Sequence, residues 1–254
     1  GIGTPVKLKD ARIYYKKAAD KGDVKSMCRY AYMQENGIGT QKENKEKALK
    51  YYKLAADKGD VKSMHHYAFL IDNEKDSNEE NKKEALEYYK KAADEGDDVN
   101  SMYRYAFMID NGIGTQNENK EEALKYYKKA ADKGEIKSMY RYAYMLDNAI
   151  GTKKEENKEE AFKYYKKAAD KGDIDSMNRC AIMCEKGIGT EKNKEEAFRY
   201  YKLSIDNDDI KSQYHYAFMQ ELGIGTPQNK EEALKNYKLS ADNGDINSMY
   251  RYAH

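Results

Sequence analysis

Apolar and polar residues follow each other with helical periodicity along this chain. From 120 to 132 the sequence KEEALKYYKKAAD places Ala123, Tyr127 and Ala130 at positions i, i+4 and i+7. Residues at this spacing lie on one face of an α-helix, and the charged residues between them lie on the opposite face. The pattern therefore predicts an amphipathic helix that packs through a stripe of alanine and tyrosine.

The same stretch recurs along the whole chain. Its alanine returns at intervals of 37, 37, 38, 38, 36 and 36 residues, at Ala11, Ala48, Ala85, Ala123, Ala161, Ala197 and Ala233. A fixed period of this length is the signature of a solenoid built by stacking one supersecondary element. We therefore predict one continuous array across 1–254. Its six complete repeats are 23–59, 60–96, 98–134, 135–172, 173–208 and 209–244, with partial repeats at 1–22 and 245–254.

Each repeat is predicted to contain two helices. Helix A begins after an acidic N-cap residue: Asp23, Asp60, Asp98, Glu135, Asp173, Asp209 or Asp245. It ends before a glycine able to adopt the left-handed conformation: Gly37, Gly112, Gly187 or Gly223. Helix B begins after an asparagine that approximates a capping box: Asn44, Asn81, Asn119, Asn157, Asn193 or Asn229. These signals predict an all-α fold.

Composition narrows the classes of partner. The 46 Lys+Arg and 45 Asp+Glu residues give a net charge of +1, which argues against nucleic acid or anionic lipid as an electrostatic partner. No apolar run is long enough to span a membrane. Only 39% of the residues are hydrophobic, but 25 tyrosines supply much of the missing apolar area. The chain therefore looks like a polar helical array with a tyrosine-rich core.

The residue types used in catalysis and metal binding do not form convincing groups. Cys28, Cys180 and Cys184 cannot make the bridges of a secreted disulfide scaffold, so we expect a reducing compartment and a cytoplasmic location. Cys180 and Cys184 lie at i and i+4, but no further ligands accompany them, and a packed thiol is expected. The recurring GIGT turn follows a helix and not a strand, which argues against nucleotide binding. We expect no enzyme activity, no cofactor and no metal.

The repeated motif resembles the Sel-1-like repeat, a relative of the tetratricopeptide repeat. The residues that carry the resemblance are Gly112, Gly114, Ala123, Tyr126, Tyr127, Ala130, Ala131, Gly134, Ser138, Tyr142 and Ala143. The chain departs from the family in having Tyr-Ala where Leu-Gly is usual, and Tyr-Tyr where Trp-Tyr is usual. The resemblance implies a right-handed α/α superhelix of antiparallel helix pairs, with the A helices on the concave side. It also implies a protein-binding scaffold without chemistry of its own.

A helical wheel of helix A separates two faces. Ser138, Tyr142, Met145 and Leu146 fall within one arc, which we expect to be buried. The opposite arc repeats a stripe of aromatic residues, a column of bases and a column of acids down the array. The base column is Arg29, His66, Arg104, Arg141, Arg179, His215 and Arg251. The acid column is Glu35, Asp72, Asp110, Asp147, Glu185 and Glu221.

The outer arc supports two interpretations. Its charges could pair within the molecule, or its rings and guanidinium groups could bind a partner, since Tyr and Arg are enriched in binding hot spots. The candidate partner-binding residues are Arg29, Tyr103, Arg104, Phe107, Tyr140, Arg141, Tyr144, Arg179, Tyr214 and Phe218.

The leading hypothesis is a scaffold or adaptor that binds a protein or peptide on its concave A-helix face. An alternative is an accessory repeat domain of a larger signalling enzyme such as a protein kinase. Binding of RNA along the Arg and Tyr columns carries less weight, because the acid column would repel the backbone. Association of like chains through the incomplete terminal repeats also remains open.

Overall fold

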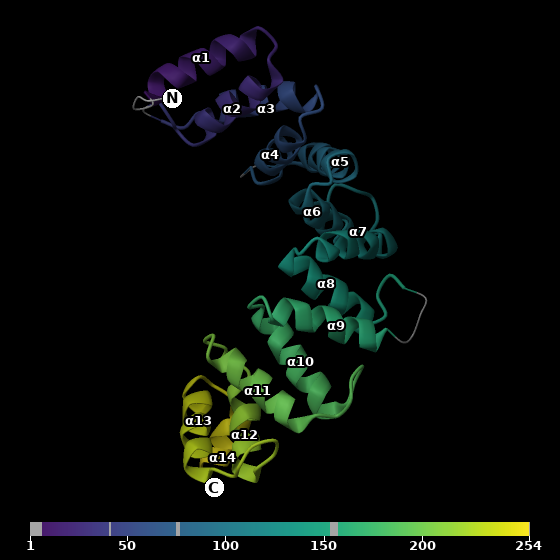
Figure 1. Cartoon of the computed structure of the whole chain (residues 1–254), viewed down its shortest axis with the longest axis vertical. Helices are drawn as coiled ribbons and strands as arrows, with labels where there is room; N and C mark the ends of the chain where they lie inside the picture. Colours follow the sequence, from purple (N-terminus) through teal and green to yellow (C-terminus); the bar gives the residue numbers. More distant parts are fainter. Residues whose placement is uncertain (1–6, 41, 75–76, 153–156, 254) are drawn as a thin grey trace. The chain divides into compact units, whose positions relative to one another are not determined.

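A computed structural model describes residues 7–40, 42–74, 77–152 and 157–253. Within these ranges the chain forms fourteen α-helices and no strand, which confirms the all-α prediction (Figure 1). The B helices are α1 (Leu8–Asp20), α3 (Lys45–Ala56), α5 (Glu79–Glu95), α7 (Lys120–Asp132), α9 (Lys158–Ala169), α11 (Lys194–Ile205) and α13 (Lys230–Asp242). The A helices are α2 (Val24–Glu35), α4 (Val61–Asp72), α6 (Val99–Asp110), α8 (Ile136–Asp147), α10 (Ile174–Lys186), α12 (Gln213–Leu222) and α14 (Ile246–Ala253).

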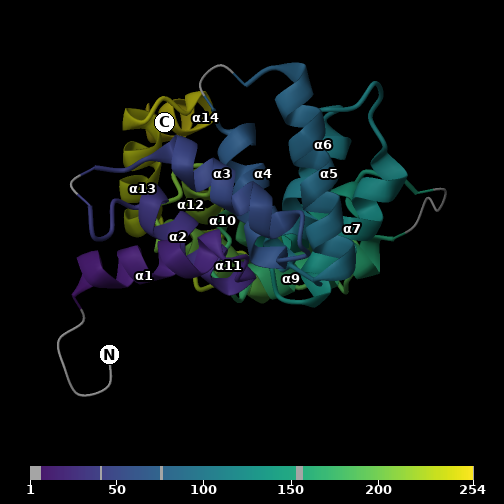
Figure 2. The same ribbon diagram turned by 90° about the horizontal axis from the view of Figure 1, so that it is seen from above.

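The chain divides into two compact units, Gly1–Ala130 and Ala131–His254. In each unit an A helix packs on the B helix that follows it, as α2 does on α3 and α8 on α9. Each B helix in turn contacts the next A helix, as α3 does α4 and α9 does α10. Figure 1 shows α2 beside α3, and Figure 2 shows α5 beside α6. Within each unit, consecutive helices therefore cover one another in the order of the sequence.

Alanine and tyrosine fill the seam between the two helices of a repeat. The first tyrosine of helix B meets a tyrosine of helix A edge-on, with ring centroids 4.7 to 5.0 Å apart. The pairs are Tyr30–Tyr51, Tyr67–Tyr88, Tyr105–Tyr126 and Tyr142–Tyr164. Alanines such as Ala123 and Ala143 are fully buried and let the backbones approach. The predicted buried arc of helix A is confirmed, because Ser138, Tyr142, Met145 and Leu146 are all buried.

The hydroxyl of the first B-helix tyrosine ties its repeat to the one before. It donates a hydrogen bond to the aspartate within one residue of the end of the preceding B helix. The pairs are Tyr51–Asp20, Tyr88–Asp57, Tyr126–Asp94 and Tyr164–Asp132. These partners are 31 or 32 residues apart. Each such tyrosine therefore packs its ring within one repeat and bonds its hydroxyl to another.

The capping signals of helix A act as predicted except at α12, which begins at Gln213 after Ser212 and not directly after Asp209. The acidic side chains accept hydrogen bonds from backbone amides of the first turn, as Asp23 does from Ser26 at 2.8 Å and Asp60 from Ser63 at 2.9 Å. One predicted start of helix B is wrong, since α5 begins at Glu79 and not after Asn81. Asn78 caps it by accepting from the Asn81 amide at 2.9 Å. Two glutamates then occupy the first turn, where the helix dipole favours negative charge.

The second glycine of the GIGT turn lies against the backbone of the preceding B helix. A Cβ atom on Gly114 would lie 2.5 Å from the Lys82 carbonyl oxygen in the first turns of α5. The equivalent glycines Gly39, Gly189 and Gly225 approach the starts of α1, α9 and α11 in the same way. The turn is therefore a joint between repeats, and only a residue without a side chain fits it.

We expect Gly114→Ala to destabilise the fold more than Gly134→Ala. Both glycines have positive φ, +67° and +98°, which costs an alanine about 1 kcal/mol or more at either position. A Cβ on Gly134 meets nothing within 4 Å, whereas one on Gly114 clashes with backbone, which adds about 1–3 kcal/mol. Urea denaturation followed by far-UV circular dichroism compares the two variants. Equal losses would contradict the close approach at Gly114.

Candidate protein-binding surface

Paired rings run along the outer face of the A helices. Tyr103–Phe107, Tyr140–Tyr144 and Tyr214–Phe218 are i,i+4 pairs with centroids 6.2 to 6.3 Å apart. The first ring of each pair also contacts the second tyrosine of the following B helix, and these contacts are Tyr103–Tyr127, Tyr140–Tyr165 and Tyr214–Tyr237. The first ring is therefore anchored in the repeat, and the second reaches further outward.

Arg104 joins its own repeat to the one before. Its guanidinium donates to the Asp72 carboxylate at 2.9 Å and to the Tyr89 hydroxyl at 3.4 Å. It also lies over the rings of Phe69 and Tyr89, 5.7 and 5.9 Å from their centroids. Phe69 and Asp72 belong to α4 and Tyr89 to α5, so Arg104 links α6 to both helices of the previous repeat.

Arg179 makes the equivalent link in the second unit. It forms an ion pair with Asp147 of α8 and lies 5.8 Å from the centroid of Tyr165. Lys158 also reaches the Asp147 carboxylate, at 2.8 Å. Burial alone would raise the pKa of Asp147, but the hydrogen bonds from Lys158 and Arg179 outweigh it and lower the pKa below the ordinary 3.8. Arg251 repeats the arrangement with Glu221 at 3.3 Å.

Two residues of the acid column, Asp110 and Asp147, are buried, although the sequence predicted them on the open face of helix A. Asp147 is only 6% exposed and Asp110 only 8%. The helical wheel placed them opposite the core of their own repeat, but side chains of neighbouring elements cover them. Lys120 pairs with Asp110 at 3.0 Å, and Arg179 pairs with Asp147. The acids thus act as internal partners for bases, which is the intramolecular interpretation for Arg104 and Arg179.

The remaining candidates keep more of their surface. Arg29 on α2 and Tyr144 on α8 are exposed, whereas Phe107, Arg141 and Phe218 are half-buried. Tyr103, Tyr140 and Tyr214 are also half-buried because they pack on helix B. A role for any of these residues in binding a partner stays a prediction.

Two members of the base column are histidines, and their rings stack flat on tyrosine. His66 lies 5.0 Å from Tyr52 with an interplanar angle of 7°, and His215 lies 5.2 Å from Tyr201 with an angle of 6°. Both tyrosines are the second of their Tyr-Tyr pair and donate to the acid column, Tyr52 to Glu35 at 2.7 Å and Tyr201 to Glu185 at 3.2 Å. An imidazole here replaces the longer arginine of the other repeats.

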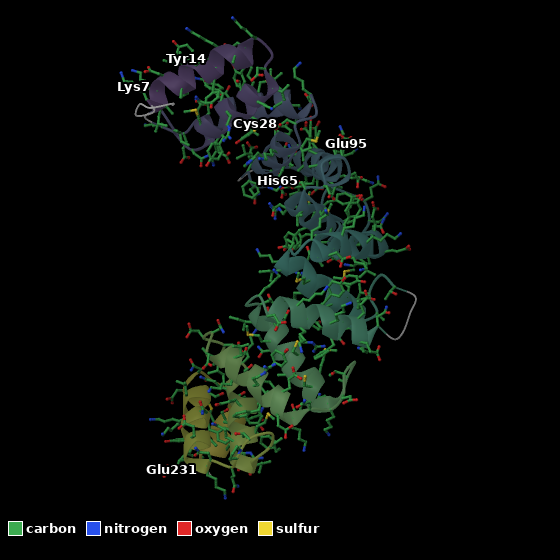
Figure 3. All side chains as sticks on the ribbon, in the orientation of Figure 1. Lys7, Tyr14, Cys28, His65, Glu95 and Glu231 are labelled. Carbon is green, nitrogen blue, oxygen red and sulfur yellow. The ribbon has the colours of Figure 1, made fainter. Side chains whose placement is uncertain are left out.

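A pocket opens beside each of these stacks. The first, of ≈ 650 Å³, lies between α2 and α4 and is lined by Lys25, Cys28, Arg29, Tyr32, Tyr52 and His66 among others. Figure 3 labels Cys28, which lies on α2. The second, of ≈ 270 Å³, lies between α10 and α12, and Asn178, Tyr201 and His215 contribute to its lining. Cys28 and Asn178 occupy the helix position held by Tyr103 in the third complete repeat.

The sequence carried a signal for these pockets that the initial prediction missed. A small side chain at the position of Tyr103 coincides with histidine in the base column of the next repeat, as Cys28 with His66 and Asn178 with His215. Aligning the repeats and asking which positions change together would have found them.

The other cysteines behave as packed thiols. Cys180 and Cys184 are fully buried, and burial raises the pKa of the Cys184 thiol to about 11 and that of Cys180 still further. No group of three or more His, Cys, Asp or Glu side chains in the described ranges is placed to hold a metal ion. None of the helices described is both long enough and apolar enough to cross a membrane.

A family model for the Sel1 repeat matches residues 1–23, 24–60, 63–97, 99–135, 136–173, 174–209 and 210–245. The chain belongs to the Sel1 repeat family. Membership suggests a protein–protein interaction scaffold, and the Sel1 fold is generally non-enzymatic.

Solved structures support the same fold. A protective antigen of uropathogenic Escherichia coli with an SLR fold has a TM-score of 0.81 at 24% identity, over 95% of this chain and 50% of the antigen. The chain thus spans about half the length of that relative. A Sel1 repeat protein from Oxalobacter formigenes has a TM-score of 0.66 at 24% identity, over 93% of this chain and 97% of that one. No curated protein matches the sequence.

We expect Asp147→Asn to lower the stability of the second unit by about 1–3 kcal/mol at neutral pH, because Arg179 and Lys158 lose their charged partner. The folded pKa of Asp147 is lowered, so its contribution is present above the unfolded value near 3.8 and is lost as pH falls through the folded pKa. The gap between the urea midpoints of the two proteins should therefore stay constant down to about pH 4 and narrow only as the pH falls further, through the folded pKa of Asp147. A gap that also stays constant at lower pH would show that the carboxylate charge is not responsible.

Arg104→Ala should destabilise the chain by about 1–3 kcal/mol, because it leaves Asp72 without its guanidinium partner and uncovers Phe69 and Tyr89. Arg29→Ala is the matched control. It removes the exposed arginine of the same column and should change stability by less than about 0.5 kcal/mol. Thermal denaturation of both variants makes the comparison. Similar small losses would indicate that the Arg104 ion pair contributes little.

Proposed function

We propose that the protein is an interaction scaffold whose A-helix surface binds a segment of a partner protein. The observation that carries this proposal is a repeated exposed ring at one position of helix A. Tyr32, Phe69 and Tyr144 occupy it with exposed fractions of 43%, 42% and 38%. Large aromatic side chains are enriched among the residues that dominate binding energy, since they combine contact area with little loss of conformational freedom.

The ion pairs of the base column change which residues we expect to contact the partner. Arg104 and Arg179 are held by Asp72 and Asp147, so their first contribution is to the stacking of repeats. They can still present one edge to a partner, but in a fixed orientation. The exposed rings and Arg29 are therefore the stronger candidates for direct contact within this proposal.

The B helices also expose apolar side chains. Leu54 on α3 and Leu203 on α11 are each 40% exposed. Each of these leucines directly follows a lysine, and neither belongs to a pair of rings like those of helix A. They supply matched control positions, because each lies in the same compact unit as one exposed A-helix ring. We also propose a cytoplasmic location, which the three free cysteines support.

Site-specific photo-cross-linking tests the proposal. A benzoylphenylalanine residue is introduced at Phe69 or Tyr144 on the A helices, and at Leu54 or Leu203 as controls. After irradiation in source cells, cross-linked proteins are identified by mass spectrometry. We expect a discrete adduct from the A-helix positions and none of the same mass from the controls. Adducts from the leucine positions alone would assign binding to the B-helix surface.

A further inference from the structure

The pocket between α2 and α4 lies where the array omits one of its own rings. In α6, α8 and α12 the corresponding position is Tyr103, Tyr140 or Tyr214. Each of these rings contacts the ring four residues later and the second tyrosine of helix B. In α2 the position is Cys28, whose side chain fills much less space. Both of the expected neighbours of the missing ring, Tyr32 and Tyr52, line the resulting pocket.

The next repeat does not close this space. Where α6 presents Arg104 over the rings of the preceding repeat, α4 presents His66, which stacks on Tyr52 and meets Tyr32 edge-on with centroids 6.5 Å apart. Tyr32 stays 43% exposed, about as much as Phe69 does beneath Arg104 at 42%. The pocket volume of ≈ 650 Å³ lies within the range of about 300–1,000 Å³ found for ligand sites.

Charge at the mouth of the pocket selects against basic ligands. Lys25, Arg29 and Lys62 all contribute to the lining, and all three are exposed. Among the residues that line this pocket, Asp60 is the one acid, and its carboxylate accepts the Ser63 amide at 2.9 Å as the cap of α4. Three cations around an aromatic recess complement a ligand that carries carboxylates beside an aromatic ring.

We propose that this pocket binds an aromatic side chain of a partner segment whose neighbouring residues are acidic. The ring takes the place that Tyr103 fills in its own repeat, between Tyr32, Tyr52 and His66. The flanking carboxylates lie near Lys25, Arg29 and Lys62. This inference rests on the proposed function, since it names the chemistry of the segment that the A-helix surface binds.

In the pocket between α10 and α12, the residue at the position of Cys28 is Asn178, and it is hydrogen-bonded to residues of the next repeat. The Asn178 amide donates to Asp209 at 2.8 Å, and its carbonyl oxygen accepts a hydrogen bond from the Ser212 hydroxyl. Asp175 stands where the first pocket has Lys25. The second pocket is therefore smaller and less cationic, and it provides the internal control.

The chain contains no tryptophan, so a tryptophan in a peptide reports binding without background. The probe is acetyl-Glu-Glu-Trp-Glu-Glu-amide, titrated with the whole chain at low salt and followed by fluorescence anisotropy. Cys28→Tyr restores the ring of the other repeats and should weaken binding at least about tenfold. Cys28→Ala keeps the recess open and should stay within about twofold of the original affinity, as should Asn178→Tyr at the second pocket.

Charge is tested in the same assay. The double variant Lys25→Glu/Lys62→Glu should bind the acidic peptide at least about tenfold more weakly, and the original chain should bind acetyl-Lys-Lys-Trp-Lys-Lys-amide more weakly by a similar factor. A melting temperature for Cys28→Tyr at or above that of the original chain confirms that loss of binding is not loss of folding.

Equal affinity of Cys28→Tyr and the original chain for the acidic peptide would overturn the inference. So would the absence of saturable binding up to about 1 mM peptide. The titration needs no natural partner, so either failure concerns this pocket alone. The cross-linking experiment tests the A-helix surface separately, and its failure would remove the proposed function instead.

Discussion

The array depends on tyrosines that serve two repeats at once. The ring of Tyr126 packs on Tyr105 within one repeat, and its hydroxyl donates to Asp94 at the end of the previous B helix. A buried ring supplies apolar contact, and its hydrogen-bonded hydroxyl avoids the cost of an unsatisfied polar group. This dual role explains how a chain with only 39% hydrophobic residues and 36% charged residues can build a core within each unit.

The second tyrosine of several B helices, such as Tyr52, Tyr201 and Tyr237, organises the outer face in a related way. Tyr237 donates to Glu221, and Glu221 pairs with Arg251 of the next A helix. Carboxylate, phenol and base thus form one connected group across the boundary between repeats. Aromatic rings on the same face that lie beyond this group keep exposed surface. The structural bases and the candidate contact rings are therefore neighbours with different roles.

Local signals were enough to predict the helices. The 36-to-38-residue period, the acidic N-caps and the stripe of Ala123, Tyr127 and Ala130 all depend on interactions within one repeat. The burial of Asp147 could not be seen on a helical wheel, because the covering groups, Arg179 and Lys158, come from other helices. The start of α5 was misplaced for a different reason. Asn78 and Asn81 are both good N-cap residues, and the helix begins after the earlier one, which makes it almost one turn longer than predicted.

The candidate site likewise has one part that the sequence predicted and one part that it did not. The aromatic stripe could be predicted from its spacing, but the pocket at Cys28 results from an exception to the repeat combined with a second exception, His66, in the next one. A consensus of the positions that the repeats share cannot reveal a pocket that depends on two departures from that consensus. Departures from the consensus carry the information about where identical-looking repeats differ in function.

The hydroxyl contact between B helices also sets a limit on repeat length. Where the period is 36 residues, the equivalent aspartate lies 30 residues before the tyrosine, as Asp170 does before Tyr200, and the buried Tyr200 hydroxyl has no hydrogen-bond partner among the described residues. In the following repeat the tyrosine is replaced by Asn236, which bonds to Gln220 instead. In a solenoid, stability is approximately a sum of repeat and nearest-neighbour terms. A repeat that is two residues shorter thus lacks one contact at a single boundary, and we expect the array to open first at that boundary.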